Sequence, residues 1–153
     1  IGVFDVNNQL LFEIQIDLIG NDTLEPVLSG ECFVVPPDVC VHTTTYTTTV
    51  ELPPIIGGYQ LAYQRCCRNQ TIVNIIDPLG SGATYGVTIS EQALLECNSS
   101  PKFNDWPPLY ICVNEPIVFD QSAVDIDGDS IVYKLCAPLL GATPDIPQPQ
   151  PPN

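Results

Sequence analysis

Seven cysteines are the side chains of this 153-residue chain with the most obvious chemistry. No two of them have the Cys-x-x-Cys spacing of zinc or thioredoxin-like sites, and the single histidine is His42, so a zinc site is not expected. Cysteines at this density more often form disulfides, which persist outside the cytosol. We therefore expect a disulfide-stapled extracellular protein whose bonds involve Cys32, Cys40, Cys66, Cys67, Cys97, Cys112 and Cys136.

The pairing of these cysteines is only partly predictable. Their spacing favours Cys32–Cys40 and Cys112–Cys136 among many possible connectivities. Consecutive side chains of a strand point to opposite faces, so Cys66 and Cys67 are expected to bond different partners. A redox role for this pair is the sharper alternative, but no helix N-terminus or Cys-x-x-Cys motif accompanies it. The odd count leaves one thiol that is free and buried, or bonded to chain outside this sequence.

The acidic stretch Asp125-Ile126-Asp127-Gly128-Asp129 is a candidate calcium site. Alternating carboxylates beside a glycine suit Ca²⁺, which binds hard oxygen ligands, and Asp120 is placed to add another ligand. An EF-hand does not fit, because Cys136 occupies the loop position that needs a bidentate glutamate. The alternative is an Asp-Gly turn with solvated carboxylates.

The aromatic side chains are candidates for ligand binding, and catalysis has no comparable anchor. Trp106 and Tyr63 could stack against sugar rings, although packing within the protein is the commoner role of such residues. His42 stands in a threonine-rich stretch with no serine or cysteine in a nucleophile setting, and no carboxylate pair is singled out among the 18 acidic residues. We assign no catalytic residue and expect that the protein is not an enzyme.

The charge balance restricts the partners further. The chain has 18 Asp and Glu against 4 Lys and Arg, giving a formal charge of −14. Four cations cannot form a basic patch, so nucleic acid and anionic membranes are poor partners. No apolar run reaches the ~18 residues that a membrane-spanning helix needs, so membrane insertion is not expected either.

Short strands must position these residues, because alternating apolar residues recur between turn-forming ones. A hairpin is predicted around Asn7-Asn8, and Ser90 is expected to cap the one helical piece, residues 90–96. Residues 144–153 read as an extended proline-rich linker. About nine strands indicate an antiparallel, immunoglobulin-like β-sandwich, with strands expected at residues 3–6, 10–18, 41–52, 59–64, 71–76, 83–89, 109–113, 117–120 and 131–136.

Several blocks of the sequence resemble large secreted proteins of Bacteroidota. They are residues 57–69, which include Tyr-Gln-Arg-Cys-Cys-Arg-Asn, residues 97–108, and residues 111–133. The similar proteins carry PKD-like or immunoglobulin-like modules and commonly end in the gliding-motility-associated domain that the type IX secretion system recognises. The resemblance implies a cell-surface location rather than an activity. Gln121 departs from the family pattern, which usually has histidine there, so no ligand role is carried over to it.

The resemblance also implies how the chain is organised. It resembles a window from a longer protein, with a β-sandwich module in residues 1–105 that lacks its N-terminal strands. Residues 106–143 would then begin a second PKD-like or immunoglobulin-like module, followed by the linker at 144–153. Asp22-Thr23-Leu24 and Asp129-Ser130-Ile131 are similar to Bacteroidota O-glycosylation sites, which makes Thr23 and Ser130 candidate glycosylated residues.

Together these features predict a non-catalytic structural module of a large extracellular surface or filament-forming protein. Disulfides, and Ca²⁺ if the acidic turn binds it, would rigidify the module. Its partners would be neighbouring modules or identical subunits, which could add strands to its sheet edges. The alternative is an adhesin module that binds surface glycans through Trp106 and Tyr63.

Overall fold

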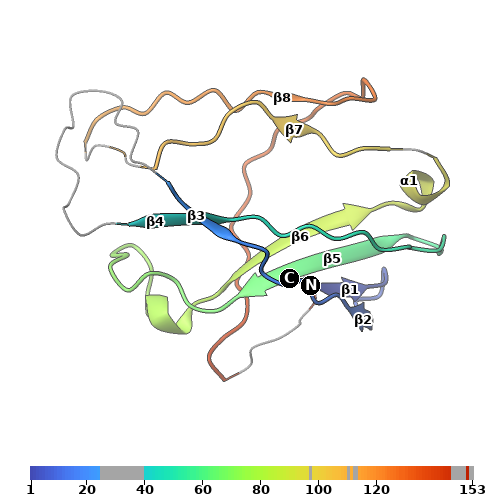
Figure 1. Ribbon diagram of the computed structural model, residues 1–153, viewed down its shortest axis with the longest axis horizontal. Coiled ribbons are helices and arrows are strands. Elements are labelled where there is room, and N and C mark those ends of the chain that lie inside the picture. Colours follow the sequence, from blue (N-terminus) through green and yellow to red (C-terminus); the bar gives the residue numbers. More distant parts are fainter. Residues whose placement is uncertain (25–39, 97, 110, 112–113, 146–150, 152–153) are drawn as a thin grey trace. The chain divides into compact units, whose positions relative to one another are not determined.

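The computed structural model describes residues 1–24, 40–96, 98–109, 111, 114–145 and 151, and these residues are almost entirely strand and loop (Figure 1). Every paired strand is antiparallel, which confirms the predicted all-β class. The described residues belong to two compact units. The first comprises Ile1–Gln15, Val50–Asn98 and Tyr133–Asn153, and the second comprises Ile16–Thr49 and Ser99–Val132.

The first unit is built on a four-stranded sheet with the strand order β2-β1-β5-β6. Its strands are β1 (Gly2–Phe4), β2 (Leu10–Glu13), β5 (Tyr59–Arg65) and β6 (Ala83–Ile89). All three residues of β1 are buried, and β2 and β5 pair with this strand on its two sides. The buried apolar side chains among the described residues all belong to this unit: Val3, Phe4, Tyr59, Ala62 and Ala142.

The predicted hairpin at Asn7-Asn8 is confirmed. Asn8 has a φ of 63°, which asparagine tolerates in tight turns. The Asp5 carboxylate organises the turn, since its Oδ1 accepts hydrogen bonds from the backbone N–H groups of Asn7 at 2.9 Å and Gln9 at 2.8 Å. These hydrogen bonds, that from Gln9 above all, lower the pKa of Asp5. β2 carries a bulge at Leu11, because Leu10 pairs with Phe4 and Phe12 pairs with Val3, which leaves Leu11 without a partner residue on β1.

Residues near the C-terminus cover part of the outer edge of β6. Thr84 pairs with Leu139 in an isolated antiparallel bridge, with its N–H 3.3 Å from the Leu139 carbonyl oxygen. The Thr84 hydroxyl donates a 2.6 Å hydrogen bond to the carbonyl of Leu140 and accepts one of 3.0 Å from Gln64 Nε2. Because Thr84 is itself buried, these contacts satisfy a polar group inside the unit.

The predicted helical piece is confirmed as α1 (Glu91–Leu95). Ser90 is its N-cap, and the Ser90 Oγ accepts a 3.1 Å hydrogen bond from the backbone N–H of Ala93. Glu91 also accepts a 3.0 Å hydrogen bond from the N–H of Gly57 through its Oε2. None of the described helices is long and apolar enough to cross a membrane.

The second unit contains two small antiparallel sheets (Figure 1). In the first, β3 (Asn21–Leu24) pairs with β4 (Val41–Thr44), so that Thr23 lies opposite His42. In the second, β7 (Lys102–Phe103) pairs with β8 (Ala123–Val124). The immunoglobulin-like sandwich predicted from the sequence stays a prediction.

Among the predicted strands within the described residues, three do not form, and the strand expected at 109–113 lies mostly outside the described residues. In residues 71–76, the Asn69 side chain accepts a hydrogen bond of 3.0 Å from the Thr71 N–H, and the Ile72 N–H bonds back to the Asn69 carbonyl at 3.1 Å. This turn competes with an extended ladder. Residues 117–120 and 131–136 are irregular, because β-branched residues favour strands only where another strand packs beside them. The strands expected at 10–18 and 41–52 end early, at Glu13 and Thr44.

The sequential modules expected at 1–105, 106–143 and 144–153 stay a prediction. Residues Ile16–Thr49 join the second unit, and Tyr133–Asn153 return to the first. The return is explained by the hydrogen bonds between Thr84 and the carbonyls of Leu139 and Leu140. Successive modules within a longer protein stay a prediction.

Candidate functional site

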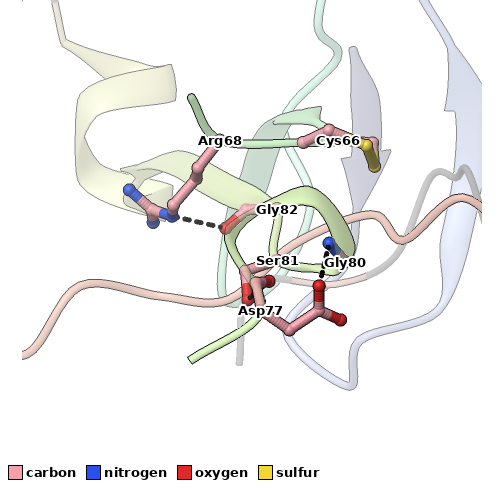
Figure 2. Close-up of a disulfide and its surroundings, with 7 residues drawn as sticks. Cys66, Arg68, Asp77, Gly80, Ser81 and Gly82 are labelled. Carbon is pink, nitrogen blue, oxygen red and sulfur yellow. Dashed lines mark hydrogen bonds between the residues drawn. A yellow bond between two sulfur atoms is a disulfide. The ribbon is translucent and has the colours of Figure 1, made fainter. Parts of the chain in front are cut away.

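A disulfide joins the consecutive residues Cys66 and Cys67 (Figure 2). The expectation that each would bond a different partner is therefore wrong. That expectation assumed that strand geometry continues through both residues, but β5 ends at Arg65. Cys67 then adopts a φ of 89°, which removes the alternation of side chains that a strand would impose.

The chain after the disulfide is held to the segment that precedes β6. The backbone N–H of Arg68 donates hydrogen bonds to the carbonyls of Pro78, at 2.9 Å, and Ser81, at 3.0 Å. The Arg68 side chain lies against the same segment, and its Nε donates a 3.1 Å hydrogen bond to the Gly82 carbonyl (Figure 2). Arg68 thus donates its hydrogen bonds to carbonyl groups of its own fold.

Residues 77–81 form a capped turn. Asp77, at a φ of 46°, caps the 3₁₀-helix Pro78–Gly80 and accepts a hydrogen bond of 3.2 Å from the Gly80 N–H (Figure 2). The Ser81 hydroxyl donates to the Asp77 carbonyl at 2.8 Å. The Cys66–Cys67 bond, Arg68 and this capped turn together define a local clamp between β5 and β6, which we call the 66–82 clamp.

The disulfide acts on this clamp rather than on distant strands. A bond between neighbouring residues closes the shortest possible loop, so the entropy that it removes from the unfolded chain is small, about 1 kcal/mol. Cys66 is half-buried and Cys67 is exposed, so a small thiol can reach the bond from solvent. Stapling of the fold by longer disulfides stays a prediction.

Two further cysteines are described. Cys40 and Cys136 carry free, exposed thiols in this structure. Their predicted partners, Cys32 and Cys112, lie outside the described residues, as does Cys97, so both pairings stay predictions. The Cys40 Sγ lies 3.3 Å from Nε2 of His42, a cysteine–histidine contact that the sequence reasoning did not anticipate.

The acidic stretch forms a tight turn. Asp125 Oδ1 accepts hydrogen bonds from the backbone N–H groups of Asp127, at 2.9 Å, and Asp129, at 3.3 Å. Gly128, at a φ of 81°, completes the turn with a 3.4 Å hydrogen bond to the Asp125 carbonyl. Asp127 accepts from the N–H of Ser99 through Oδ2 at 2.6 Å. The turn predicted as the alternative to a calcium site is thus present.

The predicted calcium ligands Asp120, Asp125 and Asp127 accept local hydrogen bonds through their carboxylates. Besides the contacts above, Asp120 accepts a 2.8 Å hydrogen bond from the N–H of Ser122. Within the described part of the chain, no three His, Cys, Asp or Glu side chains are grouped as a metal ion would require. Calcium binding stays a prediction. Calorimetry tests it: heat with the natural chain that Asp127→Asn abolishes would support the site, and no heat with either would remove it.

The sole tryptophan lines a pocket of about 510 Å³ in the second unit. Trp106 is 93% exposed and Phe103 is 60% exposed, which leaves both rings open to a ligand. We call this site the Trp106 pocket; its lining residues are Pro101, Lys102, Phe103, Asp105, Trp106, Pro107, Phe119 and Gln121.

The β7–β8 ladder brings the two walls of the Trp106 pocket together. Phe103 pairs with Ala123, and the N–H of Asn104 donates a 3.0 Å hydrogen bond to the Ser122 carbonyl. The Asn104 side chain adds a 2.9 Å hydrogen bond from Nδ2 to the Ser122 hydroxyl. Residues 101–107 are thereby fixed beside residues 119–121.

Sequence reasoning identified only one residue of this pocket, Trp106. It missed Phe103 and Phe119, although the proline and aromatic residues clustered in 101–108 were a usable signal. Tyr63, the other residue of the predicted glycan platform, is not among the lining residues. It lies on β5 of the first unit, where its ring stacks on that of Tyr85 with centroids 6.3 Å apart.

The two candidate glycosylated residues are both exposed. Thr23 lies on β3, and Ser130 follows the acidic turn. Exposure is what modification requires, and their glycosylation stays a prediction.

Comparisons of the chain with protein-family models, with curated proteins and with solved structures found no match. The resemblance to Bacteroidota surface proteins therefore stays a prediction made from the sequence.

Proposed function

We propose that the chain is a non-catalytic structural module of an extracellular surface or filament-forming protein, and that it associates with neighbouring modules through the edge strand β2. The observation that carries this proposal is the exposure of three consecutive apolar side chains on that strand. Leu10, Leu11 and Phe12 are 41%, 44% and 37% exposed.

β2 is the terminal strand of the four-stranded sheet, and within the described residues β1 is its only partner strand. An unpaired edge offers backbone N–H and C=O groups to another chain, and natural proteins usually blunt such edges with charges, prolines or bulges. β2 has a bulge at Leu11 and one charged residue, Glu13. Three exposed apolar residues in a row are otherwise unfavourable in water, so they indicate a surface that a partner covers.

The opposite edge of the sheet provides a contrast within the same unit. There the outer side of β6 at Thr84 is covered by the chain's own residues Leu139 and Leu140. The fold therefore covers part of one edge from within and offers the other to a second chain. Strand addition by a neighbouring module is the known way in which such an edge is used.

An extracellular setting is supported by the cysteine content and by the disulfide of the 66–82 clamp. The charge of −14 makes two copies repel each other, so apolar and backbone contacts must supply the attraction between them. In this proposal the protein's work is mechanical: it transmits load through paired strands and carries no reacting group.

Sedimentation of the natural chain against two charged variants tests the proposal. Leu11→Lys places a charge on the exposed edge and is expected to weaken self-association at least tenfold. Gln9→Lys adds the same charge to an exposed residue just before β2 and should leave association unchanged. A natural chain that stays monomeric up to millimolar concentration, or equal weakening by both variants, would contradict the proposal.

A further inference from the structure

The Trp106 pocket is an apolar site with an exposed aromatic anchor. Its lining combines three aromatic rings with Pro101 and Pro107, and its polar side chains are Lys102, Asp105 and Gln121. A tryptophan that is 93% exposed above such a pocket has its whole ring face available to a ligand. Sites of this composition bind partners mainly through apolar contact, with a few polar groups fixing the orientation.

The composition of the pocket favours a proline-rich peptide over a sugar. A sugar ring brings many hydroxyl groups, and each of them loses its hydrogen bonds to water unless the site replaces them. A polyproline segment instead presents apolar rings, and its carbonyl groups have no partners within the segment. Aromatic-lined grooves bind such segments because little conformational entropy is lost. The indole N–H of Trp106 and the amide of Gln121 are suitable donors to those carbonyls.

The chain itself contains a segment of this kind. Residues 144–153 read Pro-Asp-Ile-Pro-Gln-Pro-Gln-Pro-Pro-Asn, with five prolines in ten residues. Their one charged side chain is Asp145. Lys102, one of only four cations in the whole chain, lines the Trp106 pocket and offers the matching charge. Asp105 also lines the pocket and would repel the carboxylate of Asp145. This repulsion, together with the attraction to Lys102, would orient the segment with Asp145 toward Lys102.

We propose that the Trp106 pocket of one copy binds the proline-rich segment 144–153 of a second copy. Each molecule carries both the pocket and the segment, so the contact is head-to-tail and can repeat from molecule to molecule. This contact is separate from the β2 edge, since it uses other residues of the chain.

The test is a titration of the full chain with a synthetic peptide of residues 143–153, in which binding is monitored by tryptophan fluorescence. Trp106 is the sole tryptophan, so the signal reports on the pocket alone. We expect a saturable change in emission. A control peptide with alanine at positions 147, 149 and 151 should bind at least tenfold more weakly, because it loses the proline rings and the preformed extended conformation.

Two protein variants complete the test. Lys102→Gln should weaken peptide binding severalfold and reduce its dependence on salt. Trp106→Ala should abolish peptide binding, which calorimetry measures in this variant because it lacks the tryptophan signal. Its circular dichroism should stay unchanged, because the exposed indole contributes little to packing. Leu11→Lys should bind the peptide as the natural chain does, so a failure of the β2 proposal would be distinguishable from a failure of this one.

Other outcomes would overturn the inference. Emission that does not saturate, or equal binding of the proline and alanine peptides, would show that the pocket does not recognise the segment. Saturation by a neutral oligosaccharide such as cellohexaose or laminarihexaose, without a response to the peptide, would assign the pocket to glycans instead.

Discussion

The hydroxyl of Thr84 donates a 2.6 Å hydrogen bond to the carbonyl oxygen of Leu140, 56 residues later in the chain. Thr84 lies on β6, and the contact covers part of the outer edge of that strand with the chain's own residues. The same hydroxyl accepts a hydrogen bond from the side-chain amide of Gln64 on β5. One buried side chain thus connects two strands of the sheet with the segment that returns from the second unit.

Replacing this hydroxyl should destabilise the first unit. Thr84→Val keeps the shape of the side chain but leaves the Leu140 carbonyl without its donor, which typically costs about 1–3 kcal/mol. Urea unfolding measures the loss. Thr88→Val is the matched control, since Thr88 is an exposed residue of the same strand and should tolerate the change within about 0.5 kcal/mol. Equal effects of the two substitutions would refute the role given to Thr84.

The disulfide between Cys66 and Cys67 should matter little for global stability. The double variant Cys66→Ser, Cys67→Ser is expected to lose about 1 kcal/mol, because the closed loop is the shortest possible. Denaturant unfolding with intact-mass verification of the oxidised state measures this. A loss above about 3 kcal/mol would mean that these cysteines hold together parts of the chain farther apart than the 66–82 clamp.

Arg68 should be more important to the 66–82 clamp than its exposed neighbours are. Arg68→Ala removes the Nε–H that bonds to the Gly82 carbonyl, and we expect a loss of about 1–2 kcal/mol. Gln70→Ala, at an exposed position two residues later, is the control and should be nearly neutral. Hydrogen exchange should show faster opening of residues 66–82 in the arginine variant alone.

The β1–β2 hairpin should weaken at acid pH through Asp5. Backbone hydrogen bonds, that from Gln9 first, lower the pKa of this carboxyl below its usual value of 3.8. A group with a lowered folded-state pKa contributes stability above its unfolded pKa and loses it as the pH falls through the folded value. Stability should therefore drop below about pH 4, and Asp5→Asn should flatten that part of the profile.

Asp17→Asn, which changes an exposed aspartate outside the hairpin turn, is the control for this pH profile. If Asp5→Asn does not alter the fall in stability at acid pH, or if Asp17→Asn reduces it equally, Asp5 is not the cause of that fall.

The sequence predicted the fold correctly where the hydrogen bonds of an element are made by residues close to it in the chain. Asn7-Asn8 identified the first hairpin and Ser90 identified the helix cap, because each depends on neighbouring backbone groups. The alternating residues 59–64 likewise became β5. The strand at 71–76 was wrong because the Asn69 side chain bonds the following turn, a competition that apolar content does not reveal.

The sites depend on contacts that spacing does not encode. The Cys66–Cys67 bond was missed because the strand pattern hides the point at which β5 ends. Trp106 was recognised as a candidate by its residue type, but Phe119 reaches the same pocket only through the pairing of β7 with β8. The return of residues 133–145 to the first unit rests on Thr84, a residue with no special sequence signal.

Hydrogen–deuterium exchange of residues 10–13, measured in dilute and in concentrated solutions of the natural chain, tests the central claim most directly. If a second chain adds a strand at β2, exchange in this segment should slow at least tenfold on association, while residues 83–89 of β6 change far less. Association that leaves the exchange of residues 10–13 unaltered would contradict the assignment of β2 as the assembly edge.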